Sequence, residues 1–171
     1  YVECPVMGGP VQAEEGICGG IVGASNDNFK KAEVYLKTFC KDYFHFGDVG
    51  KGAKSKLLNN FLSLSTATNV IEFIKSAKKL DIDLEKLFAV SKLGSGNSAA
   101  LNRIFDNVLK EDYTGFKFST SKTLKDLTYI HEMLKDFGNS EKLADLEKSF
   151  YKKAVDEGNG DLFISELIKK D

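Results

Sequence analysis

The chain has 171 residues, a length typical of one domain or of one domain with part of a second. Hydrophobic residues make up 42% of it and charged residues 29%, which is enough apolar material for a packed core and excludes a disordered chain. The formal net charge is -1, and Arg103 is the only arginine. We therefore expect neither nucleic acid nor a membrane as a partner.

The composition changes near residue 52. Both prolines, all three cysteines and nine of the 15 glycines lie within the first 52 residues. The cysteines are odd in number and form no C-x-x-C pair, and the two histidines, His45 and His131, lie far apart in sequence. No metal site is therefore expected, and free, buried thiols in a reducing compartment are favoured. With neither an apolar run of membrane-spanning length nor a secretory leader in these residues, we predict a cytoplasmic protein.

In the first part, short apolar runs alternate with glycine. The pattern predicts a strand over 1–6, a turn over 7–10, a second strand over 17–24, a helix over 26–40 and a brief strand over 43–46. This is the composition of an α/β domain, but 50 residues are too few to complete a sheet of that class.

From 54 to 80 nothing breaks a helix, and the apolar residues of its first half lie on nearly every side, which predicts burial all round. Shorter amphipathic helices are predicted downstream. They cover 83–93, a segment capped by Ser95 or Asn97 and ending near Leu109, one capped by Thr120 or Ser121 and stopped by Gly138, one capped by Ser140 and stopped by Gly158, and 161–169. The predicted fold class is thus mainly α: an all-helical domain over 51–171 with a long central helix, preceded over 1–50 by the last strands of an incomplete Rossmann-type sheet.

The glycine cluster at 47–52 suggests a phosphate-binding loop, but Gly50-Lys51 is followed by Gly52, where a Walker loop needs serine or threonine. Lys56 and Asn60 are better candidates, because they are one helical turn apart on one face. Partial burial would lower the pKa of Lys56 toward the range of a general acid or base. The alternative is a lysine that extends to the surface at a helix start.

Three ordered segments resemble the β-hydroxyacid dehydrogenase family, which contains 3-hydroxyisobutyrate dehydrogenase and tartronate semialdehyde reductase. Residues 47–60 resemble its G-x-V-G-x-G-x-x-x-K-x-x-N-N segment, and C-P-V-M-G-G at 4–9 is similar to its A-P-V-S-G-G substrate loop. Phe118 followed by K-D-L at 125–127 resembles its late F-x-x-x-x-x-x-K-D-L motif. The segments span most of the chain, which we identify as the C-terminal portion of a family member.

The resemblance implies that Lys56 exchanges a proton with a small 3-hydroxy acid or its carbonyl product while hydride moves to or from NAD or NADP. Gly8 and Gly9 would offer backbone N–H groups to the substrate carboxylate beside Met7, and Asn60 would hold substrate oxygens. Met7 replaces the family's serine and Gln12 stands where glycine is common, which leaves the substrate open. The residues before Lys56 also lack the histidine of 6-phosphogluconate dehydrogenases, which disfavours a sugar phosphate.

In the late motif, the resemblance places Phe118 at the substrate, Lys125 near the cofactor and Asp126 as the group that orients Lys125. Core packing for Phe118 and a surface helix charge for Asp126 are equally open. The family's glycine-rich dinucleotide-binding unit is not found in these residues, so we expect the cofactor to be held mostly by a domain absent from this chain and the chain alone to be inactive. We also expect a homodimer through the helical domain. The alternatives are a non-catalytic helical dimerisation module and an imine-reducing relative.

Overall fold

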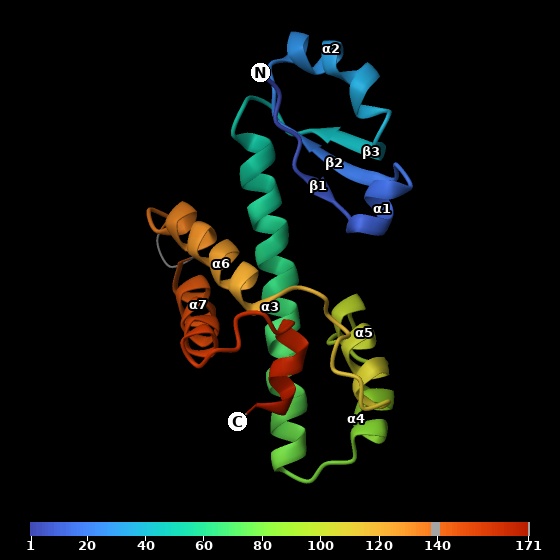
Figure 1. Cartoon of the computed structure of the whole chain (residues 1–171), viewed down its shortest axis with the longest axis vertical. Coiled ribbons are helices and arrows are strands. Elements are labelled where there is room, and N and C mark those ends of the chain that lie inside the picture. Colours follow the sequence, from blue (N-terminus) through green and yellow to red (C-terminus); the bar gives the residue numbers. More distant parts are fainter. Residues whose placement is uncertain (138–140, 171) are drawn as a thin grey trace. The chain divides into compact units, whose positions relative to one another are not determined.

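The computed structural model describes residues 1–137 and 141–170 (Figure 1), and the chain divides into two compact units, Tyr1–Asn60 and Phe61–Asp171. Helix α3, Lys51–Lys79, contributes residues to both units. The predicted mainly helical architecture with a long central helix and a small sheet is confirmed. The division into domains at 50/51 stays a prediction.

The first unit is a three-stranded sheet with two helices. Its elements are β1 (Val6–Met7), α1 (Pro10–Glu14), β2 (Cys18–Val22), α2 (Asn26–Leu36) and β3 (Cys40–His45). The strand order is β1-β2-β3, with β1 antiparallel and β3 parallel to β2. The β2-α2-β3 segment is therefore a βαβ crossover, since parallel neighbours need such a connection.

The predicted order of strands and the helix α2 is confirmed, with shifted ends. The first strand is shorter, although Glu3 still forms a bridge with Gly23, and the chain expected to turn over 7–10 continues into α1, with Pro10 at its start. Proline suits a first helical turn because its missing N–H would have no partner there. Helix α2 ends at Leu36, and β3 begins at Cys40, earlier than predicted.

The side chains of Cys4 and Cys40 lie beside Gly20 of β2, and the third cysteine, Cys18, begins that strand. Cys18 and Cys40 are buried, Cys4 is partly buried, and all three are free, as predicted. A Cβ on Gly20 would lie 2.9 Å from the Cys40 sulfur and 3.2 Å from that of Cys4, so glycine leaves the room these side chains occupy. Burial raises the pKa of Cys40 to about 11, which makes it a weak nucleophile at neutral pH.

The predicted burial of the first half of α3 on every side is wrong. Leu58 is 50% exposed and Leu62 is 69% exposed, whereas the buried apolar residues of the helix begin at Leu64. The buried apolar residues of α3 are Leu64, Ala67, Val70, Ile71, Ile74 and Ala77. The apolar content of a helix does not determine which of its faces meets a packing partner in the same chain.

The second unit adds helices to the rest of α3. They are α4 (Leu84–Ser91), α5 (Ala99–Val108), α6 (Thr120–Leu134), α7 (Glu141–Asp156) and a C-terminal 3₁₀ helix (Ile164–Lys169). In Figure 1, α4 and α5 lie to one side of α3, and α6 and α7 lie to the other. Stacked rings of Phe88 and Phe105, with centroids 4.8 Å apart, fill the α4–α5 side of this core.

Two of the predicted caps are wrong by one to three residues. Ser98 caps α5 in place of Ser95 or Asn97, and Ser119 caps α6 in place of Thr120 or Ser121. Each stands in a run of serine, threonine or asparagine, all competent caps, so composition leaves the choice open. The expected stop at Gly138 and cap at Ser140 lie outside the described residues. Gly158, with φ +83°, follows the end of α7 as predicted.

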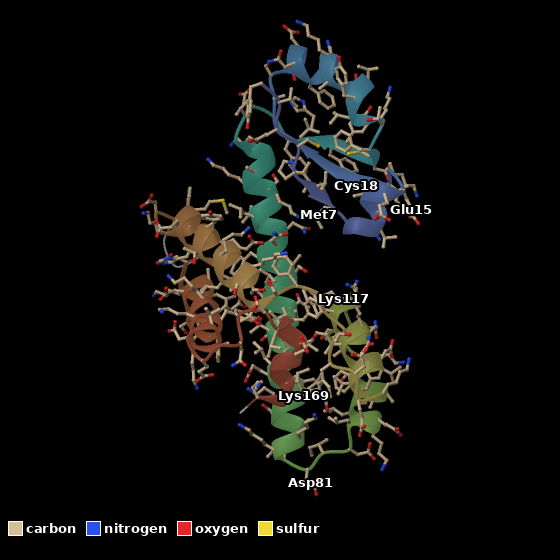
Figure 2. The ribbon with its side chains drawn as sticks, in the orientation of Figure 1. Met7, Glu15, Cys18, Asp81, Lys117 and Lys169 are labelled. Carbon is tan, nitrogen blue, oxygen red and sulfur yellow. The ribbon has the colours of Figure 1, made fainter. Side chains whose placement is uncertain are left out.

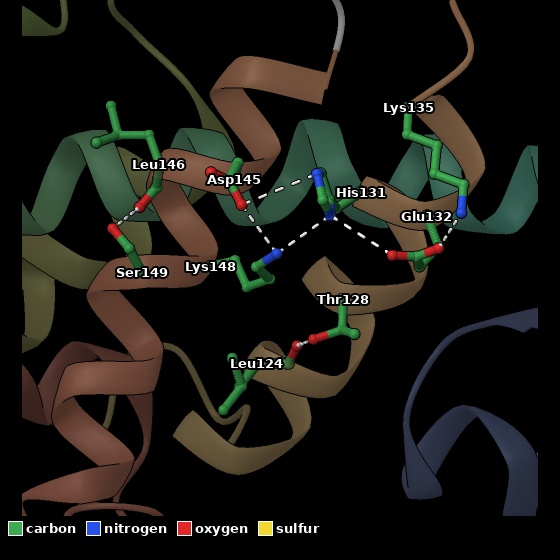
Figure 3. Close-up of polar contacts among 9 residues, drawn as sticks. All are labelled: Leu124, Thr128, His131, Glu132, Lys135, Asp145, Leu146, Lys148 and Ser149. Atoms are coloured by element: carbon green, nitrogen blue, oxygen red, sulfur yellow. Dashed lines mark hydrogen bonds and ion pairs between the residues drawn. The ribbon is translucent and has the colours of Figure 1, made fainter.

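Helices α6 and α7 are joined by a cluster of polar contacts (Figure 3). Lys148 Nζ lies 2.8 Å from Asp145 Oδ1 and 3.1 Å from His131 Nδ1. An ammonium group can only donate, so Lys148 is the donor in this contact. Asp145 is largely exposed, whereas the side chains of Lys148 and His131 are partly buried.

Two buried polar contacts join α7 to α3. Tyr151 Oη lies 2.6 Å from Thr68 Oγ1, whose own proton goes to the Leu64 carbonyl oxygen at 2.8 Å, so the tyrosine is the donor. One turn away, the Ser65 hydroxyl donates to Glu147 Oε2 at 3.0 Å. Burial raises the pKa of Glu147, and the hydrogen bond from Ser65 opposes this more weakly. The ionised carboxylate is thus unfavourable in the folded chain.

We expect Glu147→Gln to stabilise the chain at neutral pH by about 1 kcal/mol, a rise in Tm of roughly 2–4 °C. The native chain binds more protons than the unfolded chain between the ordinary and the raised pKa of Glu147, so the wild type loses stability as the pH rises through this window. The advantage of the variant should therefore vanish below the ordinary glutamate pKa. Thermal unfolding across pH measures it, with exposed Glu157→Gln as the control, and a constant difference at all pH values would contradict it.

Among the residues that the structure describes, no helix combines the length and apolar character needed to cross a membrane.

Candidate functional site

Lys56, Asn59 and Met7 converge in the first unit. Lys56 and Asn59 lie three residues apart on α3, and Met7 ends β1 (Figure 2 labels Met7). The Met7 sulfur lies 3.3 Å from Lys56 Nζ and 3.3 Å from Asn59 Nδ2, so both groups donate to it. Met7 and Lys56 belong to two different sequence motifs and are 49 residues apart, and the structure brings them into contact. Asn60 is the next residue of α3 and is partly buried.

The start of α3 is fixed by a residue that the sequence did not indicate. Glu3 Oε1 accepts hydrogen bonds from the backbone N–H groups of Gly50, at 2.8 Å, and Ala53, at 3.1 Å. Gly50 immediately precedes α3 and Ala53 lies in its first turn, where a carboxylate also compensates the helix dipole. The glycine cluster is therefore an anchor for Glu3, which occupies the position that a bound phosphate would need. No local signal reveals this contact, because its partners are 47 and 50 residues apart.

Two glycines let α3 begin against the end of β2. A Cβ on Gly52 would lie 2.8 Å from both the Gly23 nitrogen and the Ile21 carbonyl oxygen. A Cβ on Gly23 would lie 2.8 Å from the Gly52 nitrogen and would overlap the Glu3 carboxylate. This close backbone approach sets where α3 starts, and Lys56 follows one turn later.

The loop between β1 and α1 holds the predicted Gly8 and Gly9. Gly8 has φ +124°, which favours glycine, and the Gly9 N–H donates to Gln12 Oε1 at 2.8 Å. Gln12 is exposed. A carboxylate that binds Gly9 as the family resemblance implies must first displace this amide oxygen. The sequence marked Gln12 as unusual but gave no indication of its contact.

Phe118, Lys125 and Asp126 lie in the second unit. Lys125 Nζ is 3.0 Å from Asp126 Oδ1; the lysine side chain is 57% exposed, whereas the aspartate is buried. Phe118 is partly buried, and its carbonyl oxygen accepts from the Ile164 N–H at 3.0 Å. The ion pair is the contact that an orienting role for Asp126 needs, although the roles of all three residues remain predictions.

The βαβ unit of this chain does not fit a dinucleotide pyrophosphate. Its turn from β2 to α2 lacks the G-x-G-x-x-G pattern, and the space beside Gly23 holds the Glu3 carboxylate, which would repel phosphate. Asp27 adds a second negative charge in the first turn of α2. Lys125, exposed and cationic, is a better candidate for a cofactor contact. In residues 1–137 and 141–170 no group of three or more histidine, cysteine, aspartate or glutamate side chains could hold a metal ion.

Comparison with known proteins shows the fold and the relatives of the chain. The chain has the fold of the crystal structure of 3-hydroxyisobutyrate dehydrogenase from Salmonella typhimurium, with a TM-score of 0.83 and 23% identity over 98% of this chain and 59% of that one. It is 29% identical to a probable mitochondrial 3-hydroxyisobutyrate dehydrogenase of Dictyostelium discoideum, over 93% of this chain and 51% of that protein. It is 31% identical to a 2-(hydroxymethyl)glutarate dehydrogenase of Eubacterium barkeri, over 67% of this chain and 38% of that protein.

The chain shares its fold with this crystal structure, and a family model also matches most of its length. Residues 50–170 match the family described as "NAD-binding of NADP-dependent 3-hydroxyisobutyrate dehydrogenase", and the chain belongs to this family. The resemblance found in the motifs is therefore confirmed. The chain spans about half the length of the curated relative from Dictyostelium. That relative is described as mitochondrial, so a cytoplasmic location for this chain stays a prediction.

Proposed function

We propose that this chain forms the lysine-bearing part of an NAD(P)-dependent oxidoreductase that acts on the CH–OH group of a small 3-hydroxy acid. The observation that carries the proposal is the position of Lys56, whose ammonium group is directed at Met7 in the predicted substrate loop. Membership of a family described as 3-hydroxyisobutyrate dehydrogenase supports the reaction class.

When bound, the nicotinamide supplies or accepts the hydride. In the reducing direction, the Lys56 ammonium donates to the carbonyl oxygen and gives up a proton as the alkoxide forms. In the oxidising direction, the neutral amine takes the proton of the substrate hydroxyl. Asn59 and Asn60 supply amides close to the same point of α3, and the backbone N–H of Gly9 becomes available when Gln12 moves aside.

The remaining parts of the proposal concern the cofactor and the assembly. Lys125, held by Asp126, contacts the cofactor, NAD or NADP, most of which is bound outside this chain. The helical domain, 51–171, also forms a homodimer in this proposal. The exposed Leu58 and Leu62 of α3 support it, because a second copy would remove them from water.

The test is hydride transfer by the longest native protein that carries this chain, followed through the nicotinamide absorbance with NAD and with NADP. We expect turnover of 3-hydroxyisobutyrate or a related 3-hydroxy acid. Turnover of cyclic imines alone would instead indicate an imine reductase. Absence of turnover with every substrate and both cofactors would overturn the proposal. That result would favour a non-catalytic dimerisation module. The observation that supports this alternative is the Met7 sulfur, which accepts the hydrogen bonds of Lys56 and Asn59 that a substrate oxygen would need.

A further inference from the structure

The strongest feature that the proposed function does not use is the environment of the Met7 sulfur. A thioether is a weak hydrogen-bond acceptor, yet two N–H donors, one of them charged, are directed at this sulfur at 3.3 Å each. A sulfoxide oxygen on the same sulfur would be a far stronger acceptor for both. Met7 is 37% exposed, so a small oxidant can reach it.

The position of the Met7 side chain is also fixed by the sheet. Met7 pairs with Gly19 of β2, and a Cβ on Gly19 would lie 3.4 Å from the Met7 Cβ, so the methionine extends across a glycine. Lys56 and Asn59 approach from one face of α3, whose start is anchored by Glu3. The donors are therefore in place before any oxidation, and the flexible lysine and methionine side chains can adjust to admit an oxygen atom.

We propose that Met7 is a site of reversible oxidation by hydrogen peroxide, at which Lys56 and Asn59 hold the sulfoxide oxygen. The sulfur lone pair attacks one peroxide oxygen, the S–O bond forms and the O–O bond breaks. The sulfur loses two electrons, and the departing hydroxide takes up the proton of the transferred oxygen and leaves as water. As the sulfur lone pair is used for the S–O bond, the two N–H groups shift from the sulfur to the peroxide oxygens and stabilise the negative charge that develops there.

The modification would have a direct consequence for the site. Once the sulfoxide oxygen accepts from Lys56 Nζ, a substrate oxygen must compete with this stronger acceptor for the ammonium group, and the enlarged side chain takes up space in the loop. Oxidation would thus switch off proton transfer by Lys56, and reduction of the sulfoxide by a methionine sulfoxide reductase would restore it. This consequence rests on the proposed function, whereas the modification itself does not.

The experiment follows both methionines of the chain, Met7 and the partly buried Met133 of α6, by peptide mass spectrometry during exposure of the native protein to hydrogen peroxide. We expect Met7 to be oxidised faster than Met133. Lys56→Ala and Asn59→Ala should each lower the ratio of the two rates by about fivefold, the loss of one hydrogen bond. Both variants uncover the sulfur, so if exposure alone governed the rate, the ratio would stay the same or rise, and the proposal would be overturned.

A second measurement tests the consequence for activity. Hydride transfer by a Met133→Leu variant, in which Met7 is the remaining methionine of this chain, should fall in proportion to the Met7 sulfoxide and recover after treatment with methionine sulfoxide reductase. Full activity with Met7 completely oxidised would refute the switch. A protein without activity in any form would instead disprove the proposed function, and the mass measurement would still decide whether the sulfoxide site exists.

Discussion

Lys56→Ala lowers kcat for hydride transfer by about 10²–10⁴-fold, the usual loss when a positioned general acid or base is removed. The Lys56 ammonium is the charged group directed at the substrate loop, and alanine leaves nothing there to give or accept the proton. The KM should change little, because substrate binding in the proposed mechanism depends mostly on the loop and on Asn59 and Asn60. The measurement is steady-state kinetics of the longest native protein, across pH.

Lys54→Ala is the matched control, since Lys54 is an exposed lysine of the same helix, one turn from Gly50. Its kcat should stay within about twofold of the wild type. A small primary amine added to Lys56→Ala should restore part of the rate, which a merely structural role would not allow. Activity undiminished in Lys56→Ala would show that another group transfers the proton. Unfolding curves of the variants exclude loss of the fold as the cause.

Much of the architecture could be predicted from sequence because its signals are local. The unbroken run from 54 to 80 fixed α3 to within three residues at its start, and Gly158 marked the end of α7. Where several residues could serve equally, as in the serine-rich run before α5, the local signal was degenerate and the cap was assigned to the wrong residue. The 3₁₀ form of Ile164–Lys169, expected as an α-helix, depends on contacts that a short pattern does not contain.

The site was predictable only in part. Lys56 and Met7 stood out because each occupies a motif position, and the structure brings them into contact. Glu3 and Gln12 did not stand out as contacts, because their partners are set by tertiary geometry: one reaches a helix start 47 residues away, and the other folds back on its own loop. Asn60 was chosen as the neighbour of Lys56 and Asn59 was not. Helical spacing hardly distinguishes the two, because residues at i+3 and i+4 both lie beside residue i.

The second large effect is expected at Gly52. In Gly52→Ala the new methyl group would lie 2.8 Å from two backbone atoms, Gly23 N and Ile21 O, neither of which can move without separating α3 from β2. We expect a loss of about 3 kcal/mol in the free energy of unfolding, or roughly 6–12 °C in Tm. Because the same contact sets the start of α3, the folded fraction of the variant should also position Lys56 poorly and lose activity.

Two further glycines separate the crowding at Gly52 from the general effect of alanine. A Cβ on Gly96 would meet no atom within 4 Å, so Gly96→Ala should stay within about 0.5 kcal/mol of the wild type. Gly50 also has open space but a φ of +93°, so Gly50→Ala should cost about 1–2 kcal/mol through backbone strain alone. Chemical denaturation of the three variants gives the order Gly52→Ala, Gly50→Ala, Gly96→Ala. If Gly52→Ala were no worse than Gly96→Ala, α3 would not be docked on β2 through this backbone contact, and Glu3 alone would have to hold the helix that carries Lys56.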